Sequence, residues 1–278
     1  MELIVRILLV AAGIIWILAI KDVNLKFVVI SLVLAQVVEI IWLIVQSVKE
    51  SGSNFLSIIL SSTIHRNKKV RLSCSYLFKI KIDDSYLLVK NSHRPSYQPV
   101  GGVYKRTNES DNFLSSILFN EDEKLTNGSA CDKDLRIHIK GKHLKKYLTW
   151  YNKNINREIS HTREFYEELI TTGILRSDLF PYPTYSFKKR IHTPLKWSRP
   201  FHCYELLIYD ILELTPNENQ LNELRRLQKQ GDTDYVKWAK AETIRGIGYN
   251  NANRRADYEI GDHTTLLIDF EYSKKYMS

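Results

Sequence analysis

The 278-residue sequence predicts an N-terminal two-helix hairpin that spans a membrane, followed by an α+β domain with a mixed sheet. Two long apolar runs fill the first 48 residues and predict the hairpin. Beyond residue 69, stretches typical of strands and of amphipathic helices follow one another without regular alternation, which favours an α+β domain. We therefore expect three parts: the hairpin at 1–48, a linker with a short helix at 49–69, and the α+β domain at 70–278.

The apolar runs cover about residues 3–20 and 27–48, with the polar turn KDVNLK between them. At about 1.5 Å per residue, each run as a helix can cross a hydrocarbon core about 30 Å thick. Two alternatives stay open: the first run is a cleaved signal peptide, or both runs are buried helices of a soluble protein. The lack of a small-residue cleavage site before Lys21 argues against the first. The lack of a polar face argues against the second.

Basic residues flank the two runs unequally. Lys21 and Lys26 lie in the turn, and a larger basic set follows the second run: Lys49, His65, Arg66, Lys68, Lys69 and Arg71. The more basic side of a membrane protein stays in the cytoplasm. We therefore expect a multi-pass inner-membrane protein with its N-terminus and its α+β domain in the cytoplasm.

Gln36 and Glu39 lie near the middle of the second run, three residues apart on one helical face. Polar side chains at that depth are costly, so they face protein or water instead of lipid. In one interpretation they pack the hairpin, with Glu39 protonated and hydrogen-bonded to the first helix near Gly13. In the other they line a seam between subunits, or the wall of a pore.

The net charge of +9 lies entirely beyond residue 48, because the first 48 residues hold three basic and three acidic side chains. Such an excess favours anionic partners: a nucleotide, a nucleic acid or an anionic membrane surface. The cysteines, Cys74, Cys131 and Cys203, form no Cys-x-x-Cys pair. This argues against a zinc site or a disulfide framework and favours reduced, buried thiols.

The α+β domain begins with an expected helix at 55–64. Residues 70–82 and 86–90 are rich in strand formers and are joined by an Asp-Asp-Ser turn, so they predict a hairpin. Prolines and a glycine pair mark 92–106 as a loop that leads into a short strand, and the polar stretch 107–133 reads as an inserted loop. Periodicity predicts the remaining elements. These are a strand at 134–139, helices at 142–153 and 163–175, strands near 184–192 and 203–214, helices near 217–229 and 234–243, and a strand at 264–270.

The stretch REFYEEL, residues 163–169, carries the strongest chemical signal. On a helix, Glu164, Glu167 and Glu168 stand at positions i, i+3 and i+4 and share one face. Unpaired carboxylates so close together repel one another, and Mg²⁺ held through their oxygens relieves the repulsion. Arg163 is placed to neutralise or orient one of them. The alternative is a solvated acidic face without a ligand.

A second set of residues is placed to meet the phosphates of a nucleotide. The candidate ligand-binding residues are His93, Arg94, Gly101, Gly102, Lys105 and Arg163. His93, Arg94 and Lys105 flank the glycine pair, where they are placed to meet phosphates; solvated loop charges are the alternative. The aromatic candidates for stacking on a base are Trp150, Tyr151, Tyr97 and Tyr104, although a place in the core is the better interpretation of Trp150.

REFYEEL matches the core of the Nudix box, Arg-Glu-hydrophobic-x-Glu-Glu, and LLVKNSHRPSYQPVGGVYK resembles the strand and loop ahead of that box. The resemblance covers about residues 70–270 and implies a Nudix-like domain. It also implies that Glu164, Glu167 and Glu168 are the catalytic base and metal ligands of a nucleotide hydrolase. The chain departs from the full box, because Ile155 stands at the glutamate eight residues before the arginine and Thr149 at the glycine. We therefore expect weak or no hydrolysis.

A two-span hairpin joined to a divergent Nudix domain resembles the membrane effectors of bacterial cyclic-oligonucleotide antiphage signalling (CBASS), whose SMODS/CD-NTase-associated Nudix domain is the sensor. The resemblance implies a homo-oligomeric effector in a bacterial inner membrane, which binds a cyclic nucleotide and impairs membrane integrity. A nucleic-acid polymer is not expected as a partner. Two other classes stay open: a membrane-tethered, Mg²⁺-dependent Nudix pyrophosphohydrolase of nucleoside diphosphate derivatives, and a scaffold that anchors a partner.

Overall fold

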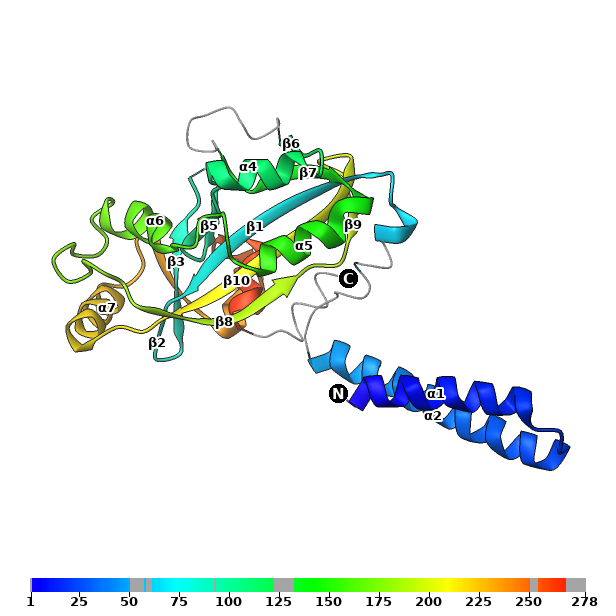
Figure 1. The fold of residues 1–278 in the computed structure, drawn as a ribbon. Coiled ribbons are helices and arrows are strands. Elements are labelled where there is room, and N and C mark those ends of the chain that lie inside the picture. Colours follow the sequence, from blue (N-terminus) through cyan, green and yellow to red (C-terminus); the bar gives the residue numbers. More distant parts are fainter. Residues whose placement is uncertain are drawn as a thin grey trace. The chain divides into compact units, whose positions relative to one another are not determined.

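The computed structural model describes residues 2–50, 58, 62–92, 94–122, 133–250 and 255–268. Figure 1 shows its ribbon. The chain divides into two units, Met1–Leu56 and Ser57–Ser278, each with its own internal contacts. Most of the helix predicted at 55–64 lies outside the described residues, as do His93 and Cys131. Cys74 and Cys203 are buried free thiols, as the sequence predicts.

The first unit consists of two helices, α1 (Glu2–Ala19) and α2 (Val23–Glu50). Asp22 caps α2, because its carboxylate accepts hydrogen bonds from the backbone N–H groups of Asn24 (2.8 Å) and Leu25 (3.1 Å). Among the described residues, one segment, Val23–Ile40, is long and apolar enough to cross a membrane. The apolar part of α1, Leu9–Ala19, is shorter.

α1 and α2 approach each other closely where the sequence places a glycine. A Cβ atom on Gly13 would lie 2.4 Å from Cγ2 of Val33, so a larger residue at Gly13 would push the helices apart. Gly13 thus lies opposite Val33 and not opposite Glu39. In this pair of helices Gln36 is partly buried, whereas Glu39, three residues further on, is exposed. The two polar residues therefore have different surroundings.

The second unit is an α+β domain with a mixed sheet, as predicted. Its larger sheet has the order β6-β7-β1-β10-β8, with β5 paired to β1 and β9 to β10. β1 and β10 run parallel, and the other pairs are antiparallel. The strands are β1 (Lys69–Lys79), β5 (Gly101–Val103), β6 (Asn120–Glu121), β7 (Arg136–Lys140), β8 (Tyr185–His192), β9 (Lys196–Ser198) and β10 (Cys203–Leu214).

A smaller sheet has the order β11-β3-β4-β14, with β2 paired to β3. Its strands are β2 (Lys81–Ile82), β3 (Ser85–Lys90), β4 (Ser96–Gln98), β11 (Val236–Lys240) and β14 (Glu259–Ile260). A separate short pair joins β12 (Tyr249–Asn250) to β13 (Arg255–Ala256). Leu77 and Ile211 of the larger sheet share a buried cluster with Leu88 and Ala239 of the smaller one. The core of the domain therefore includes the space between the two sheets.

Helices complete the domain: α4 (Asn108–Ser115), α5 (Leu144–Asn152), α6 (Thr162–Phe165), α7 (Glu218–Gln230) and α8 (Ala241–Arg245). Figure 1 shows α4 and α5 over the larger sheet. The ring of Phe113 on α4 stacks on Trp150 of α5, with centroids 4.8 Å apart. The Tyr147 hydroxyl of α5 lies 3.1 Å from Sγ of Cys74 on β1. The apolar face predicted for residues 142–153 is therefore packed against the sheet.

The predicted hairpin at 70–90 is correct only at its tip. β2 and β3 form a tight hairpin in the smaller sheet, in which Asp83 has a φ of 50°. β1, which was predicted to pair with β3, belongs to the larger sheet instead. The prediction of a plain loop at 107–133 is wrong for Asn108–Ser115, which form α4 after the cap residue Thr107, and for Asn120–Glu121, which form β6.

Two predicted elements near the C-terminus are wrong. Residues 236–240, predicted as helix, form β11 because they pair with β3, and only 241–245 are helical. The strand predicted at 264–270 is a 3₁₀ turn over Asp262–Leu267 whose last four side chains are all buried. A short buried run such as TTLL can be a strand or a helical turn, and its periodicity does not distinguish the two. Residues 269–278 lie outside the described part of the chain.

Candidate functional site

The REFYEEL stretch is helical, as predicted, but its pitch changes midway. α6 continues into a π-helical turn, Tyr166–Ile170, in which the N–H of Thr171 donates to the carbonyl oxygen of Tyr166 at 2.8 Å. Such wide turns are rare in proteins overall, and those that do occur are often found at functional sites. Glu164 and Glu168 are partly buried here, whereas Glu167 is exposed. The three carboxylates are therefore not equivalent.

The glycine pair of β5 receives the two partly buried carboxylates. The N–H of Gly101 donates to Oε2 of Glu168 at 3.0 Å. A Cβ atom on Gly102 would lie 2.0 Å from Oε1 of Glu164, so a side chain at this position would displace Glu164. Gly101 has a φ of 152°, and its Cβ would lie 2.2 Å from the carbonyl oxygen of Tyr76. The structure thus brings the predicted glycine pair and motif together.

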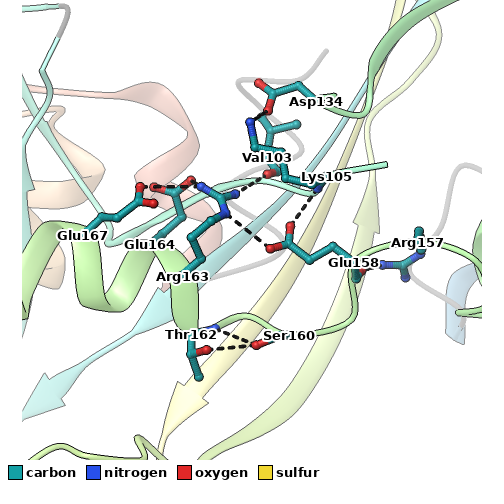
Figure 2. Close-up of polar contacts among 10 residues, drawn as sticks. All are labelled: Val103, Lys105, Asp134, Arg157, Glu158, Ser160, Thr162, Arg163, Glu164 and Glu167. Atoms are coloured by element: carbon teal, nitrogen blue, oxygen red, sulfur yellow. Dashed lines mark hydrogen bonds and ion pairs between the residues drawn. The ribbon is translucent and has the colours of Figure 1, made fainter. Parts of the chain in front are cut away.

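Arg163 is the centre of the polar contacts in Figure 2. Its Nη1 donates to Glu164 and lies 3.6 Å from the carboxylate of Glu167. Its Nη2 donates to the carbonyl oxygen of Val103 at 2.9 Å, and its Nε donates to Glu158 at 3.3 Å. One guanidinium therefore holds three carboxylates and the end of β5 in a single arrangement.

Glu158 is a site residue that the sequence analysis missed. Its carboxylate accepts from Nε of Arg163 and, at 2.7 Å, from the backbone N–H of Lys105. Ile155 stands at the position where the Nudix box has a glutamate. It is 52% exposed, and its apolar side chain cannot accept the hydrogen bonds that Glu158 accepts. The sequence did contain a clue to Glu158, because this glutamate lies only three residues after Ile155, the position of the glutamate in the Nudix box.

Burial changes the protonation of the glutamates. It raises the pKa of Glu168 to about 8, with Glu164 and Glu167 adding to the rise and the Gly101 N–H opposing it. Burial also raises the pKa of Glu164, against the pull of Arg163. At neutral pH Glu168 therefore carries a proton, and Glu164 is paired with a cation of the protein itself.

A family model described as the SMODS-associated NUDIX domain matches residues 69–268. The chain belongs to the SMODS-associated NUDIX domain family. No curated protein and no solved structure gives a significant match. The matched residues include both sheets and the whole Arg163 site, so the family assignment applies to the second unit.

The glutamates of this NUDIX domain do not fit a divalent cation in the observed conformation. Among the described side chains, no three carboxylate, histidine or cysteine groups are gathered as a metal site requires. Nη1 of Arg163 occupies Glu164, and Glu168 is turned to the Gly101 N–H. A cation would need Arg163 to withdraw first.

The other predicted ligand residues of the NUDIX domain are only partly assembled. Lys105 lies next to the Arg163 site through Glu158, but its ammonium group pairs with Asp134 at 2.7 Å. Arg94 is exposed, and its backbone N–H donates to Asn91 ahead of β4 in the smaller sheet. In the described residues no contact joins Arg94 to α6.

Tyr104 and Tyr151 do not present their rings to a ligand, because both are fully buried. The Tyr104 hydroxyl donates to Oδ2 of Asp210 at 2.6 Å and lies 2.7 Å from Nε2 of His161. Nδ1 of His161 lies 3.0 Å from the Tyr185 hydroxyl, and burial lowers the pKa of His161 to about 4. The hydrogen-bond pattern assigns a neutral imidazole that donates through Nε2 and accepts at Nδ1.

Proposed function

We propose that this protein is a membrane-anchored effector of cyclic-nucleotide antiphage signalling whose NUDIX domain binds a nucleotide second messenger without hydrolysing it. The contact between Arg163 and Glu164 carries this proposal, because an internal guanidinium occupies the carboxylate that a catalytic cation needs. Membership of the SMODS-associated NUDIX family supports a sensor in such a system. Binding without turnover suits a receptor, since the signal persists while the ligand is bound.

The N-terminal unit supplies the membrane anchor in this proposal. α2 contains a segment that can cross a bilayer, and α1 packs closely against it at Gly13. We infer a two-span hairpin in a bacterial inner membrane, with the N-terminus and the NUDIX domain in the cytoplasm. Two spans cannot enclose a pore, so the protein acts as a homo-oligomer.

The ligand needs only a higher affinity for the assembled state than for the dispersed state. A shift from almost fully dispersed to almost fully assembled requires about 5.5 kcal/mol of differential binding energy. Several subunits share this requirement, because each carries its own ligand. Assembly of the hairpins then impairs the membrane.

The test uses the full-length protein reconstituted in dye-loaded vesicles, with a panel of cyclic di- and trinucleotides. We expect calorimetry to detect binding of at least one of them, the same nucleotide to release the dye, and chromatography to recover it intact. A protein that binds none of them, or that leaks equally without nucleotide, contradicts the proposal. The first of these outcomes favours the scaffold class.

A membrane-tethered pyrophosphohydrolase is the second candidate, and the raised pKa of Glu168 favours it, because perturbed carboxyls are frequent in active sites. In this case Glu164, Glu167 and Glu168 would hold Mg²⁺ once Arg163 has withdrawn from Glu164. When bound, Mg²⁺ would polarise a phosphate and activate water. Turnover of a nucleoside diphosphate derivative by the full-length protein with Mg²⁺, abolished in Glu167→Gln, would establish the enzyme.

A further inference from the structure

Arg157 is a buried cation that has no anionic partner among the described residues. Arg157 is only 6% exposed, and no described carboxylate pairs with its guanidinium group. Nη1 donates to the carbonyl oxygen of Glu158 at 2.9 Å, and Nη2 donates to Oδ1 of Asn154. Nε is buried without a hydrogen-bond partner. Neutral oxygens and the rings of Tyr104 and Tyr151 surround this guanidinium, and none of them carries the full negative charge that would compensate it in a protein interior.

A second guanidinium lies beside it. Arg190 on β8 faces Asp210 on β10 in the strand register and binds it through two hydrogen bonds of 2.6 and 2.8 Å. The guanidinium carbons of Arg157 and Arg190 lie 4.2 and 4.5 Å from the centre of the Tyr151 ring. Asp210 is therefore paired with Arg190, and the positive charge of Arg157 remains in excess among the described residues.

Neutral amide oxygens cap the outward N–H groups of this pair. Oδ1 of Asn154 accepts from Nη2 of Arg157 and from Nη2 of Arg190, the latter at 3.3 Å. Oδ1 of Asn152 accepts from Nη1 of Arg190 at 2.9 Å. Both asparagines are exposed, so these caps lie at the surface. The oxygen of Asn154 stands between the two guanidiniums, but it carries no full charge to balance them.

We propose that Arg157 and Arg190 form a phosphate-binding site, in which a phosphate oxygen of the nucleotide replaces the amide oxygen of Asn154 between the two guanidiniums. The planar fork of arginine suits phosphate oxygens, and hydrogen bonds between charged groups are about twice as strong as neutral ones. Tyr104, Tyr151 and Asp210 hold the two arginines in place before the ligand arrives. The site rests on the proposed function in that it takes the phosphates of the same nucleotide.

This site is separate from the NUDIX glutamates, although the two are adjacent in the chain. Figure 2 shows the side chains of Arg157 and Glu158 directed to opposite sides of one segment, with Glu158 turned towards Arg163. The Nη1 atom of Arg157 donates to the carbonyl oxygen of Glu158 itself. A phosphate at Arg157 therefore contacts the segment that also positions Arg163.

The experiment titrates the full-length protein in detergent micelles with inorganic pyrophosphate and with the cyclic-nucleotide panel, at fixed ionic strength. Asn154→Gly removes the competing amide and suits the φ of 52° at this position, so we expect roughly threefold or more tighter binding. Asn156→Gly is the matched control, because Asn156 is exposed in the same loop with a φ of 56°, and we expect no change. Arg157→Gln should weaken binding roughly tenfold or more.

The proposal is overturned if the wild-type protein binds neither probe, or if Asn154→Gly binds no more tightly than the wild type. The second criterion also decides the case in which Arg157→Gln does not fold. If a cyclic nucleotide binds equally well to the wild type, Asn154→Gly and a folded Arg157→Gln, this site is excluded while the proposed function stands. If pyrophosphate responds to the variants as expected but no cyclic nucleotide binds, the phosphate site stands and the proposed function fails.

Discussion

Nη1 of Arg163 donates to the carboxylate of Glu164, its neighbour in the chain, and this contact places a cation of the protein inside the NUDIX motif. The same guanidinium reaches Glu158, Glu167 and the Val103 carbonyl. One cation of the protein thus offsets part of the negative charge of this acidic cluster without an added ion. This pairing has consequences that can be measured.

Replacing Arg163 should convert the motif into a cation site. In Arg163→Gln the three carboxylates lose their common partner, so we expect a loss of about 2 kcal/mol in the free energy of unfolding. Millimolar Mg²⁺ or Mn²⁺ should restore part of it in thermal melts. Arg176→Gln is the control, because the exposed guanidinium of Arg176 pairs with the exposed carboxylate of Asp178 outside this site. Equal stabilisation of wild type and variant by Mg²⁺ would refute the internal-cation interpretation.

Gly102→Ala should displace Glu164. The added Cβ would lie 2.0 Å from Oε1 and 2.2 Å from Cδ of Glu164, so the side chain must leave β5. We expect a loss of about 1–3 kcal/mol in unfolding free energy. The loss should shrink in a Glu164→Ala background, because the clash is then absent. Additive losses in the double variant would show that Glu164 does not cause the effect.

The stability of the NUDIX domain should fall as pH rises from about 6.5 to 8. Glu168 has a pKa of about 8 in the folded state and about 4.5 as its ordinary value, so the folded state binds more protons in this interval. The unfolding free energy therefore falls with pH, by at most about 1.4 kcal/mol per unit. Burial lowers the pKa of His161 and His192 to about 4, so their opposite effect ends near pH 6.5.

Glu168→Gln isolates this effect, since glutamine keeps the acceptor for the Gly101 N–H without titrating. Chemical unfolding between pH 6.5 and 8 should show a flatter profile for Glu168→Gln than for the wild type. The variant should also be the more stable of the two at pH 8. Parallel profiles would show that Glu168 is not the titrating group.

Tyr104→Phe should destabilise the domain by about 1–3 kcal/mol, because it leaves a buried acceptor of Asp210 and Nε2 of His161 without their shared hydroxyl. Urea unfolding measures the loss. Tyr235→Phe is the matched control. Tyr235 is exposed, so loss of its hydroxyl should change the free energy of unfolding little. Similar small losses in both variants would mean that the buried chain contributes little to stability.

Glu39→Leu tests the membrane step. Glu39 is exposed on the helix pair whereas Gln36 is partly buried, so Glu39 is the better candidate for a seam between subunits. We expect the variant to insert and to bind nucleotide but to release less dye from vesicles. Val38→Leu, at an exposed apolar neighbour, should behave as the wild type. Full dye release by Glu39→Leu would exclude the seam.

The sequence by itself determined the elements whose signal is local. The buried side of α5, the long strands β1 and β10, and α7 follow from periodicity within a dozen residues, and the motif REFYEEL pointed to the family. Residues 236–240 escaped prediction because pairing with β3, far away in the chain, selects the strand. Local propensity is weaker than such pairing.

Only the tertiary structure decided how the site is connected. The sequence grouped Glu164, Glu167 and Glu168, but the π turn and the close approach of Gly101–Gly102 give them different partners and different burial. Arg190 and Asp210 meet because the register of β8 on β10 sets them opposite each other. Arg157 joins them through the Tyr151 ring. Electrostatic contacts depend on distance in space, and spacing along the chain fixes that distance only within a single helix or strand.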